Sequence, residues 1–304
     1  MRHGSGYFET LVQDSSDTKS FFWPNFLTRL TQVQFILPIL VTILISILLA
    51  QFTVSTQFHS NSWVSLFDSA DEVFVTLNIF FIILISIGSL FIFFRLFKKR
   101  RELAVRILVA TFILSGILAT LLFTKMLFNS LKLEFPLILI VVAIVTYIGA
   151  YFGYLVIVDS ISNRMRNTLF IICSGILGSF FGVLVPTFPI MASLLLLSIV
   201  DILLIKRRTV EKIFGEMAYE KILTEISFSN KVWGIGIGDL TCYSIVVANT
   251  TANFGFLSSA VSFLLLLVGS VLSLKITLSK GRLPGLPISI VLGLLPAIIQ
   301  IFFL

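Results

Sequence analysis

Long apolar runs alternate with short polar segments along most of the chain. The runs are about 17 to 25 residues long, the length that a helix rising ~1.5 Å per residue needs to cross a hydrocarbon layer of about 30 Å. The pattern therefore predicts an all-α polytopic membrane protein. Nine transmembrane helices are expected, near residues 31–52, 73–97, 103–127, 135–158, 169–185, 190–205, 232–249, 254–277 and 287–304.

The boundary between the fifth and sixth spans depends on the segment Pro186-Thr187-Phe188-Pro189. Two closely spaced prolines either turn the chain between two helices or kink one long helix. The distribution of charge favours a turn, because it divides the basic residues most cleanly when the spans are counted as nine. Twenty of the 22 Lys and Arg residues then fall on one side of the membrane, and two fall on the other.

This asymmetry also predicts the orientation of the chain. Because loops that face the cytoplasm carry an excess of Lys and Arg, the N-terminus is expected in the cytoplasm and the C-terminus outside. The net charge of +7 is explained by these loops, so no nucleic-acid partner is expected. The start of the chain does not resemble a cleavable signal peptide, and the first span is expected to act as the insertion signal.

Composition agrees with a lipid environment and excludes several classes of site. The chain is 57% hydrophobic and 12% charged, whereas about a quarter of an ordinary soluble domain is charged. Cys173 and Cys242 both fall within apolar spans, which argues against a disulfide framework. With only His3 and His59 present, a multi-histidine metal centre is not expected, and no cofactor is predicted.

The loop at residues 206–231, between the sixth and seventh spans, is the only sizeable one predicted. Its apolar residues recur at near-helical spacing between charged residues, which predicts an amphipathic helix at the membrane surface. Such a helix is either a simple connector or a lid that controls the entry of a substrate. The apolar positions are Val210, Ile213, Phe214, Met217, Ile222 and Ile226.

Two aspartates, Asp201 and Asp239, lie inside predicted spans. A carboxylate at the centre of a bilayer costs roughly 2.5 to 3.5 kcal/mol even on a lenient scale, so a functional role is the default expectation. Asp201 precedes Lys206 by five residues, and Asp239 follows Lys231 by eight. If both stretches are helical, the two carboxylates lie ~7.5 Å and ~12 Å from the cytoplasmic ends of consecutive antiparallel helices.

Carboxylates at matched depth can meet if the two helices pack side by side. Two like charges at short range cannot both ionise easily, so one keeps a proton. The ionised member can activate a water molecule, and the protonated member can donate a hydrogen bond to the carbonyl that the water attacks. Asp201 and Asp239 are therefore candidate catalytic residues. An ion or proton path through the membrane is the alternative role for such a pair.

Glycines and prolines surround these acids. Gly236 and Gly238 leave room for another backbone to approach Asp239, although close packing of helices explains glycines at such positions nearly as well. The segment Leu283-Pro284-Gly285-Leu286-Pro287 resists helix formation, so it is expected to enter the membrane extended and to pair with a substrate backbone, or else to form a plain turn. A third set of glycines is expected only to pack helices: Gly175, Gly178 and Gly182.

Together these three elements resemble the presenilin and signal peptide peptidase superfamily of intramembrane aspartyl proteases, particularly its archaeal members. The matching positions are Asp201, the motif Gly236-Ile237-Gly238-Asp239, and Pro284-Gly285-Leu286. The resemblance covers residues 190–290 and implies a presenilin-like fold of nine helices in which the two aspartates hydrolyse peptide bonds. Val200 stands where the family has tyrosine, and Gly285 where it has alanine.

The resemblance also implies an organisation and a substrate. Residues 1–304 would form one transmembrane domain, with scaffold helices in 1–186 and the catalytic helices six to nine in 187–304. The orientation derived from charge is that of presenilin, so the substrates would be single transmembrane helices with their N-termini outside. A cation- or proton-coupled transporter is the main alternative, although no internal repeat supports it. A scaffold that binds helices without cutting them is the third possibility.

Overall fold

The computed structural model describes residues 24–55, 95, 101–131, 135–207, 227–229, 234–280 and 285–303, and these residues are almost entirely helical. Seven helices and one pair of short strands are present in these ranges. The elements are α2 (Pro24–Ser55), α4 (Arg101–Leu131), α5 (Phe135–Ile157), α6 (Asn163–Leu184), α7 (Thr187–Arg207), β1 (Ser227–Ser229), β2 (Gly234–Gly236), α10 (Ile237–Lys280) and α11 (Leu286–Phe303).

Five of these helices, α2, α4, α5, α6 and α10, are long and apolar enough to cross a membrane. Two shorter apolar stretches lie in α7 and α11, each of 10–17 residues. The prediction of an all-α membrane protein is confirmed at this level. Apart from Arg95, the second predicted span at 73–97 lies outside the described residues, and so does the amphipathic part of the loop at 206–231. The count of nine therefore stays a prediction.

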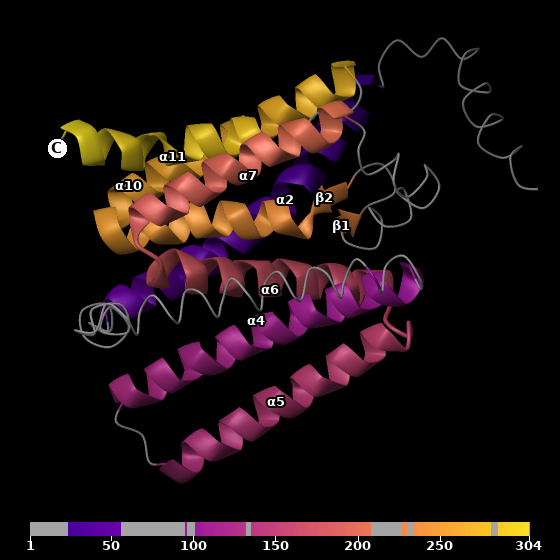
Figure 1. Ribbon diagram of the computed structural model, residues 1–304, viewed down its shortest axis with the longest axis vertical. Helices are drawn as coiled ribbons and strands as arrows, with labels where there is room; N and C mark the ends of the chain where they lie inside the picture. The colour runs from indigo at the N-terminus through magenta and orange to yellow at the C-terminus, as the bar shows by residue number, and fades with distance from the viewer. Residues whose placement is uncertain are drawn as a thin grey trace, which may run out of the picture.

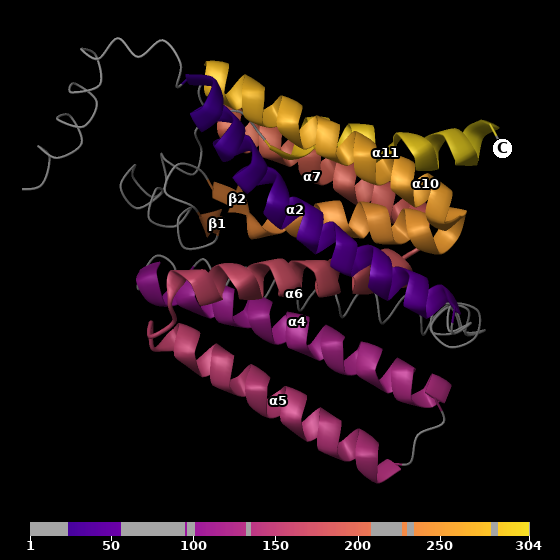
Figure 2. The same cartoon turned by 180° about the vertical axis from the view of Figure 1, so that it is seen from behind.

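The helices form a bundle in which α10 is central (Figure 1). It packs against α2, α6 and α11, while α4 and α5 continue the bundle on the far side of α6. The reverse view shows the same order, with α2 crossing in front of α6 and α10 (Figure 2). The strands and the starts of α2, α4, α6, α10 and α11 lie at one end of the bundle, and the C-terminus lies at the other. The side of the membrane that each end faces stays a prediction.

The single element α10 contains two antiparallel helical segments. Gly255 has φ 85 and ψ 174, a non-helical conformation that interrupts the helix and that glycine adopts without the steric cost of a Cβ. Across this break, Thr251 and Ser259 form a hydrogen bond of 2.6 Å, and the Ser262 hydroxyl donates to Thr250. Residues twelve apart would be ~18 Å apart in a straight helix. The chain therefore turns back at Gly255, the second residue of the predicted span 254–277, so the turn between the seventh and eighth spans lies slightly later than predicted.

The prolines after α6 form a turn between two helices, as the sequence predicts. Helix α6 is capped by Val185, whose extended backbone (φ −91, ψ 134) precedes Pro186, a conformation that proline imposes on the residue before it. The side-chain amide of Asn249 donates hydrogen bonds to the carbonyls of Gly182 and Val185. These bonds satisfy carbonyl groups that lose their intrahelical partners where α6 ends.

The glycines of α6 pack helices closely, which confirms their predicted role. A Cβ atom on Gly175 would lie 2.9 Å from the Thr42 carbonyl oxygen of α2, and one on Gly182 would lie 2.7 Å from the Ala248 Cβ of α10. A Cβ on Gly178 would collide with Ser244. Small residues let backbones approach, which is how helices associate in lipid without a hydrophobic driving force.

The predicted start of the seventh span is wrong. Residues 234–236 form β2, which pairs antiparallel with β1, and the helix begins only at Ile237. Ser227 faces Gly236, Phe228 faces Ile235 and Ser229 faces Gly234. The apolar content of 232–249 indicated a helix, but glycine and isoleucine alternate at 234–238, a period of two that is typical of a strand. The estimate that Asp239 lies ~12 Å along a helix from Lys231 fails for the same reason.

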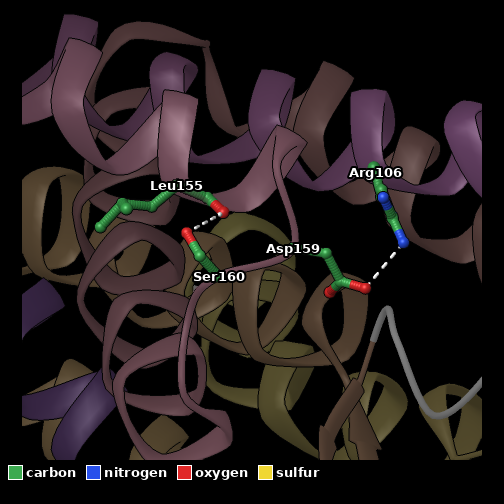
Figure 3. Close-up of polar contacts among 4 residues, drawn as sticks. All are labelled: Arg106, Leu155, Asp159 and Ser160. Atoms are coloured by element: carbon green, nitrogen blue, oxygen red, sulfur yellow. Dashed lines mark hydrogen bonds and ion pairs between the residues drawn. The ribbon is translucent and has the colours of Figure 1, made fainter.

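An ion pair connects α4 to the turn between α5 and α6 (Figure 3). Arg106 Nη2 lies 2.7 Å from Asp159 Oδ2, and the Ser160 hydroxyl donates to the Leu155 carbonyl. Asp159 has φ 61, the left-handed conformation that commonly ends a helix. Both side chains are partly exposed, so the pair contributes at most about 1 kcal/mol.

Replacing Asp159 separates the effect of the ion pair on stability from the effect of the left-handed backbone. Asp159→Gly loses the ion pair but relieves the left-handed backbone, so its free energy of unfolding stays within about 1 kcal/mol of wild type. Asp159→Ala loses the ion pair and keeps a Cβ, so it is about 1 kcal/mol less stable than the glycine variant. Thermal unfolding in detergent measures the difference, and equal stability of the two variants would contradict the backbone argument.

Candidate functional site

Both predicted aspartates lie at the end of the bundle that carries the strands. Asp201 is in the last two turns of α7, and Asp239 is in the first turn of α10. Both side chains are half-buried. The two carboxylates are close enough to interact electrostatically, although they are 38 residues apart in the chain. The closer meeting of the two carboxyl groups that a shared proton requires stays a prediction.

Local structure explains the position of Asp239. Strand β2 ends at Gly236 and α10 begins at Ile237, so Asp239 is the third residue of the helix. The Gly236 N–H donates a hydrogen bond back to the Asp239 carboxylate. An acidic residue at this position commonly reaches back to the residue that caps the helix, and its charge is favourable beside the helix N-terminus. The transition from strand to helix thus orients this carboxylate.

Asp201 is oriented by the start of a different helix. The backbone N–H of Leu286, the first residue of α11, donates a hydrogen bond to the Asp201 carboxylate. The first N–H groups of a helix have no intrahelical partner and commonly bind anions. The preceding residue lies beside the other acid, because a Cβ added to Gly285 would lie 3.2 Å from Asp239 Oδ2. Gly285 and Leu286 therefore connect the two carboxylates.

The proline-containing segment is only partly described. Leu283 and Pro284 lie outside the described residues. Gly285 forms a bend, and α11 begins at Leu286, so the expectation of an extended backbone is wrong for Leu286 and Pro287. Proline is well tolerated in the first turn of a helix because the N–H groups there have no intrahelical partner. The alternative, a turn that leads into a helix, describes Gly285 to Pro287 better.

The two glycines before Asp239 are not crowded by neighbouring helices. A Cβ on Gly236 would lie 3.5 Å from Asp239 itself, which is an ordinary contact. A Cβ on Gly238 would meet no atom within 4 Å, and Gly238 is exposed. Close packing of helices therefore does not account for Gly238 in the described part of the protein, where none of the atoms would obstruct another backbone beside Gly238.

Sequence reasoning missed Tyr243 and Ser289. Tyr243 follows Asp239 by four residues, which places both on the same face of α10. The Tyr243 hydroxyl lies 3.4 Å from the Gly285 carbonyl oxygen and 3.2 Å from Ser289 Oγ, and both side chains are buried. The spacing of four from Asp239 is the signal that could have identified Tyr243. Nothing in the sequence marks Ser289 among the other serines of the spans.

Two carboxylates near each other, both fixed by backbone N–H groups, suit general acid-base chemistry on a substrate that enters between them. Among the described residues, no group of three or more His, Cys, Asp or Glu side chains is arranged to hold a metal ion. Cys173 and Cys242 are buried and free, as their positions in apolar spans suggested.

No model of a protein family matches the chain, and no curated protein matches it significantly.

Proposed function

We propose that this protein is an intramembrane aspartyl protease, which cleaves peptide bonds within transmembrane helices. The observation that carries the proposal is the pair of Asp201 and Asp239, brought together from α7 and α10 within electrostatic range. Intramembrane carboxylates are costly and rare. Two that meet at one end of a bundle, with an uncrowded glycine beside one of them, provide the acid, the base and a path for a substrate backbone.

The mechanism follows from two carboxyl groups that share one proton. The ionised carboxylate takes a proton from a water molecule as its oxygen attacks the carbonyl carbon of the scissile bond, and the protonated carboxyl hydrogen bonds to the carbonyl oxygen. The resulting tetrahedral intermediate collapses when the C–N bond breaks and the leaving nitrogen takes a proton from a carboxyl group. No covalent enzyme intermediate and no cofactor are needed.

The substrate is proposed to be a single transmembrane helix. A peptide must be unwound locally before water can reach its carbonyl, because a helix encloses its backbone groups in hydrogen bonds. Such an unwound segment is proposed to lie beside Gly238, where no atom of the described residues comes within 4 Å of an added Cβ. The motifs around Asp201, Asp239 and Gly285 resemble those of the presenilin superfamily, which supports the same assignment and a nine-helix fold with a cytoplasmic N-terminus.

Reconstituted protein tests the proposal. Purified chain in liposomes is expected to cut a model transmembrane helix at bonds within its apolar span, and a transition-state-mimicking inhibitor of aspartyl proteases is expected to block the cut. The alternative, a cation- or proton-coupled transporter, predicts ion-dependent flux and no cleavage. Flux without cleavage across a panel of helical substrates would overturn the proposal in favour of transport, and inhibitor binding without cleavage would favour a scaffold.

Replacement of Gly238 tests the route of the substrate. Gly238→Leu is expected to lower kcat/KM by about tenfold or more, because its side chain occupies the path to Asp239. The same change is expected to leave stability unchanged or slightly higher, because leucine favours helices more than glycine does. Cleavage kinetics and thermal unfolding measure the two effects. Destabilisation with normal cleavage would show instead that Gly238 packs against a neighbouring helix.

A further inference from the structure

We infer that Tyr243 is a positioning residue for the aspartate pair, acting through the first turn of α11. The inference rests on the proposed function, because it concerns the geometry of the same two carboxylates. Tyr243 reaches neither acid through a hydrogen bond in the described contacts; its hydroxyl is directed at Gly285 and Ser289 instead. Its effect on Asp201 and Asp239 is therefore transmitted through the backbone of Gly285 and the first turn of α11.

Three groups form a closed set of hydrogen bonds at the start of α11. The Tyr243 hydroxyl donates either to the Gly285 carbonyl oxygen, at 3.4 Å, or to Ser289 Oγ, at 3.2 Å. Ser289 Oγ in turn lies 3.2 Å from the same carbonyl oxygen. Each hydroxyl has one proton, so Ser289 donates to the Gly285 carbonyl and Tyr243 donates either to Ser289 or to the same carbonyl, which has two lone pairs. The carbonyl of Gly285 is thereby tied to the first segment of α10.

The second segment of α10 supports α11 from another position. A Cβ on Gly269 would lie 2.7 Å from Ser289 Cα and 3.1 Å from the Ile288 carbonyl oxygen. These are backbone atoms, so a side chain at 269 would have to displace α11 itself. Gly269 thus allows a close approach of two backbones, and Tyr243 supplies a directional hydrogen bond at the same turn.

This turn connects the two acids. The N–H of Leu286 binds the Asp201 carboxylate, and Gly285 lies against Asp239 Oδ2. A shift of the Gly285–Leu286 peptide therefore changes the position of one carboxylate relative to the other. A displacement of about 1 Å is sufficient to reduce a catalytic rate by two orders of magnitude. Tyr243 thus maintains the distance between the carboxylates of Asp201 and Asp239 without contacting the substrate.

Tyr243→Phe tests this role, because it removes one hydroxyl and keeps the buried ring. We expect kcat for cleavage of the model helix to fall by about ten- to a hundredfold while KM stays within about twofold. Hydrogen-deuterium exchange in the first turn of α11 is expected to become about fivefold faster, the effect of losing one ordinary hydrogen bond. Tyr147→Phe is the matched control: its ring is exposed on the outer face of α5, and both measurements are expected to remain at wild-type values.

Two further variants test the inference if Tyr243→Phe destabilises the whole protein. Ser289→Ala is expected to lower kcat, and its effect should not add to that of Tyr243→Phe, because both hydroxyls act on the Gly285 carbonyl. Gly269→Ala is expected to lower kcat by displacing the same turn.

The outcomes separate the two proposals. Cleavage by Tyr243→Phe at the wild-type rate, a change confined to KM, or unaltered exchange in α11 would overturn the positioning role. Absence of cleavage by the wild-type protein would instead count against the proposed function, and exchange in the two tyrosine variants would still decide whether the hydroxyl holds the turn.

Discussion

Asp201→Asn and Asp239→Asn are each expected to lower the rate of substrate cleavage by about 10² to 10⁴-fold, the usual contribution of a general acid or base. Asparagine keeps a carbonyl oxygen that can accept the N–H of Leu286 or of Gly236, so the local hydrogen bonds and the fold should survive. What asparagine lacks is a group that can take up or release a proton. Cleavage kinetics with the reconstituted protein measure the loss.

This choice of variant separates catalysis from helix capping. If the acids serve only to cap α10 and α11, asparagine performs the same task and cleavage should continue. Asp159→Asn is the matched control, because Asp159 is an exposed aspartate in the turn after α5 and contacts neither acid in the described structure. We expect it to cleave at the wild-type rate. Activity retained by either Asp201→Asn or Asp239→Asn would refute a two-aspartate mechanism.

Gly178→Ala is expected to destabilise the protein by about 1 to 3 kcal/mol, the usual effect of adding a methyl group to a tightly packed interior. The new Cβ would collide with Ser244 and lie 2.9 Å from the Thr241 carbonyl oxygen. Neither group can rotate away, so α6 and α10 must separate. A hydrogen bond also joins this part of α10 to α2, because the Ser46 hydroxyl donates to the Ser244 carbonyl at 2.8 Å. Thermal unfolding in detergent measures the loss.

Gly153→Ala is the control for this experiment. A Cβ at 153 would lie 3.5 Å from Leu114 Cδ2, which is an ordinary contact with a flexible side chain. Both variants gain the helix propensity of alanine over glycine, about 1 kcal/mol in each case. The difference between them therefore reports the contact alone. Equal stability of Gly178→Ala and Gly153→Ala would show that the α6–α10 interface relaxes easily.

The elements that the sequence predicted well are those whose environment is uniform along their whole length. Helices α4 and α5 differ from their predicted ranges by a few residues, because every position inside a lipid span must be apolar and must form its hydrogen bonds within the helix. The turn at Pro186 was predictable because proline restricts its own backbone and that of Val185. Gly175, Gly178 and Gly182 pack helices, as their spacing in an apolar run indicates.

The start of α10 was predicted incorrectly because hydrophobicity does not distinguish a short buried strand from a helix. Gly234–Gly236 becomes a strand only because Ser227–Ser229 lies beside it to share backbone hydrogen bonds. The sequence between these two segments does not predict that they pair. The position of Asp239 in the first turn of a helix depends on this strand.

The sequence by itself determined that this chain has apolar spans of membrane length, that two acids lie within them, and that glycines and prolines surround those acids. Tertiary structure alone decided that Asp201 and Asp239 approach each other, that Gly285 and Leu286 connect them, and that Tyr243 and Ser289 hold this turn. The physical reason is the range of the interactions involved. Apolar length and backbone restriction act within a few residues, whereas the contacts of the candidate site join segments 38 to 85 residues apart, and only packing of the helices brings these together.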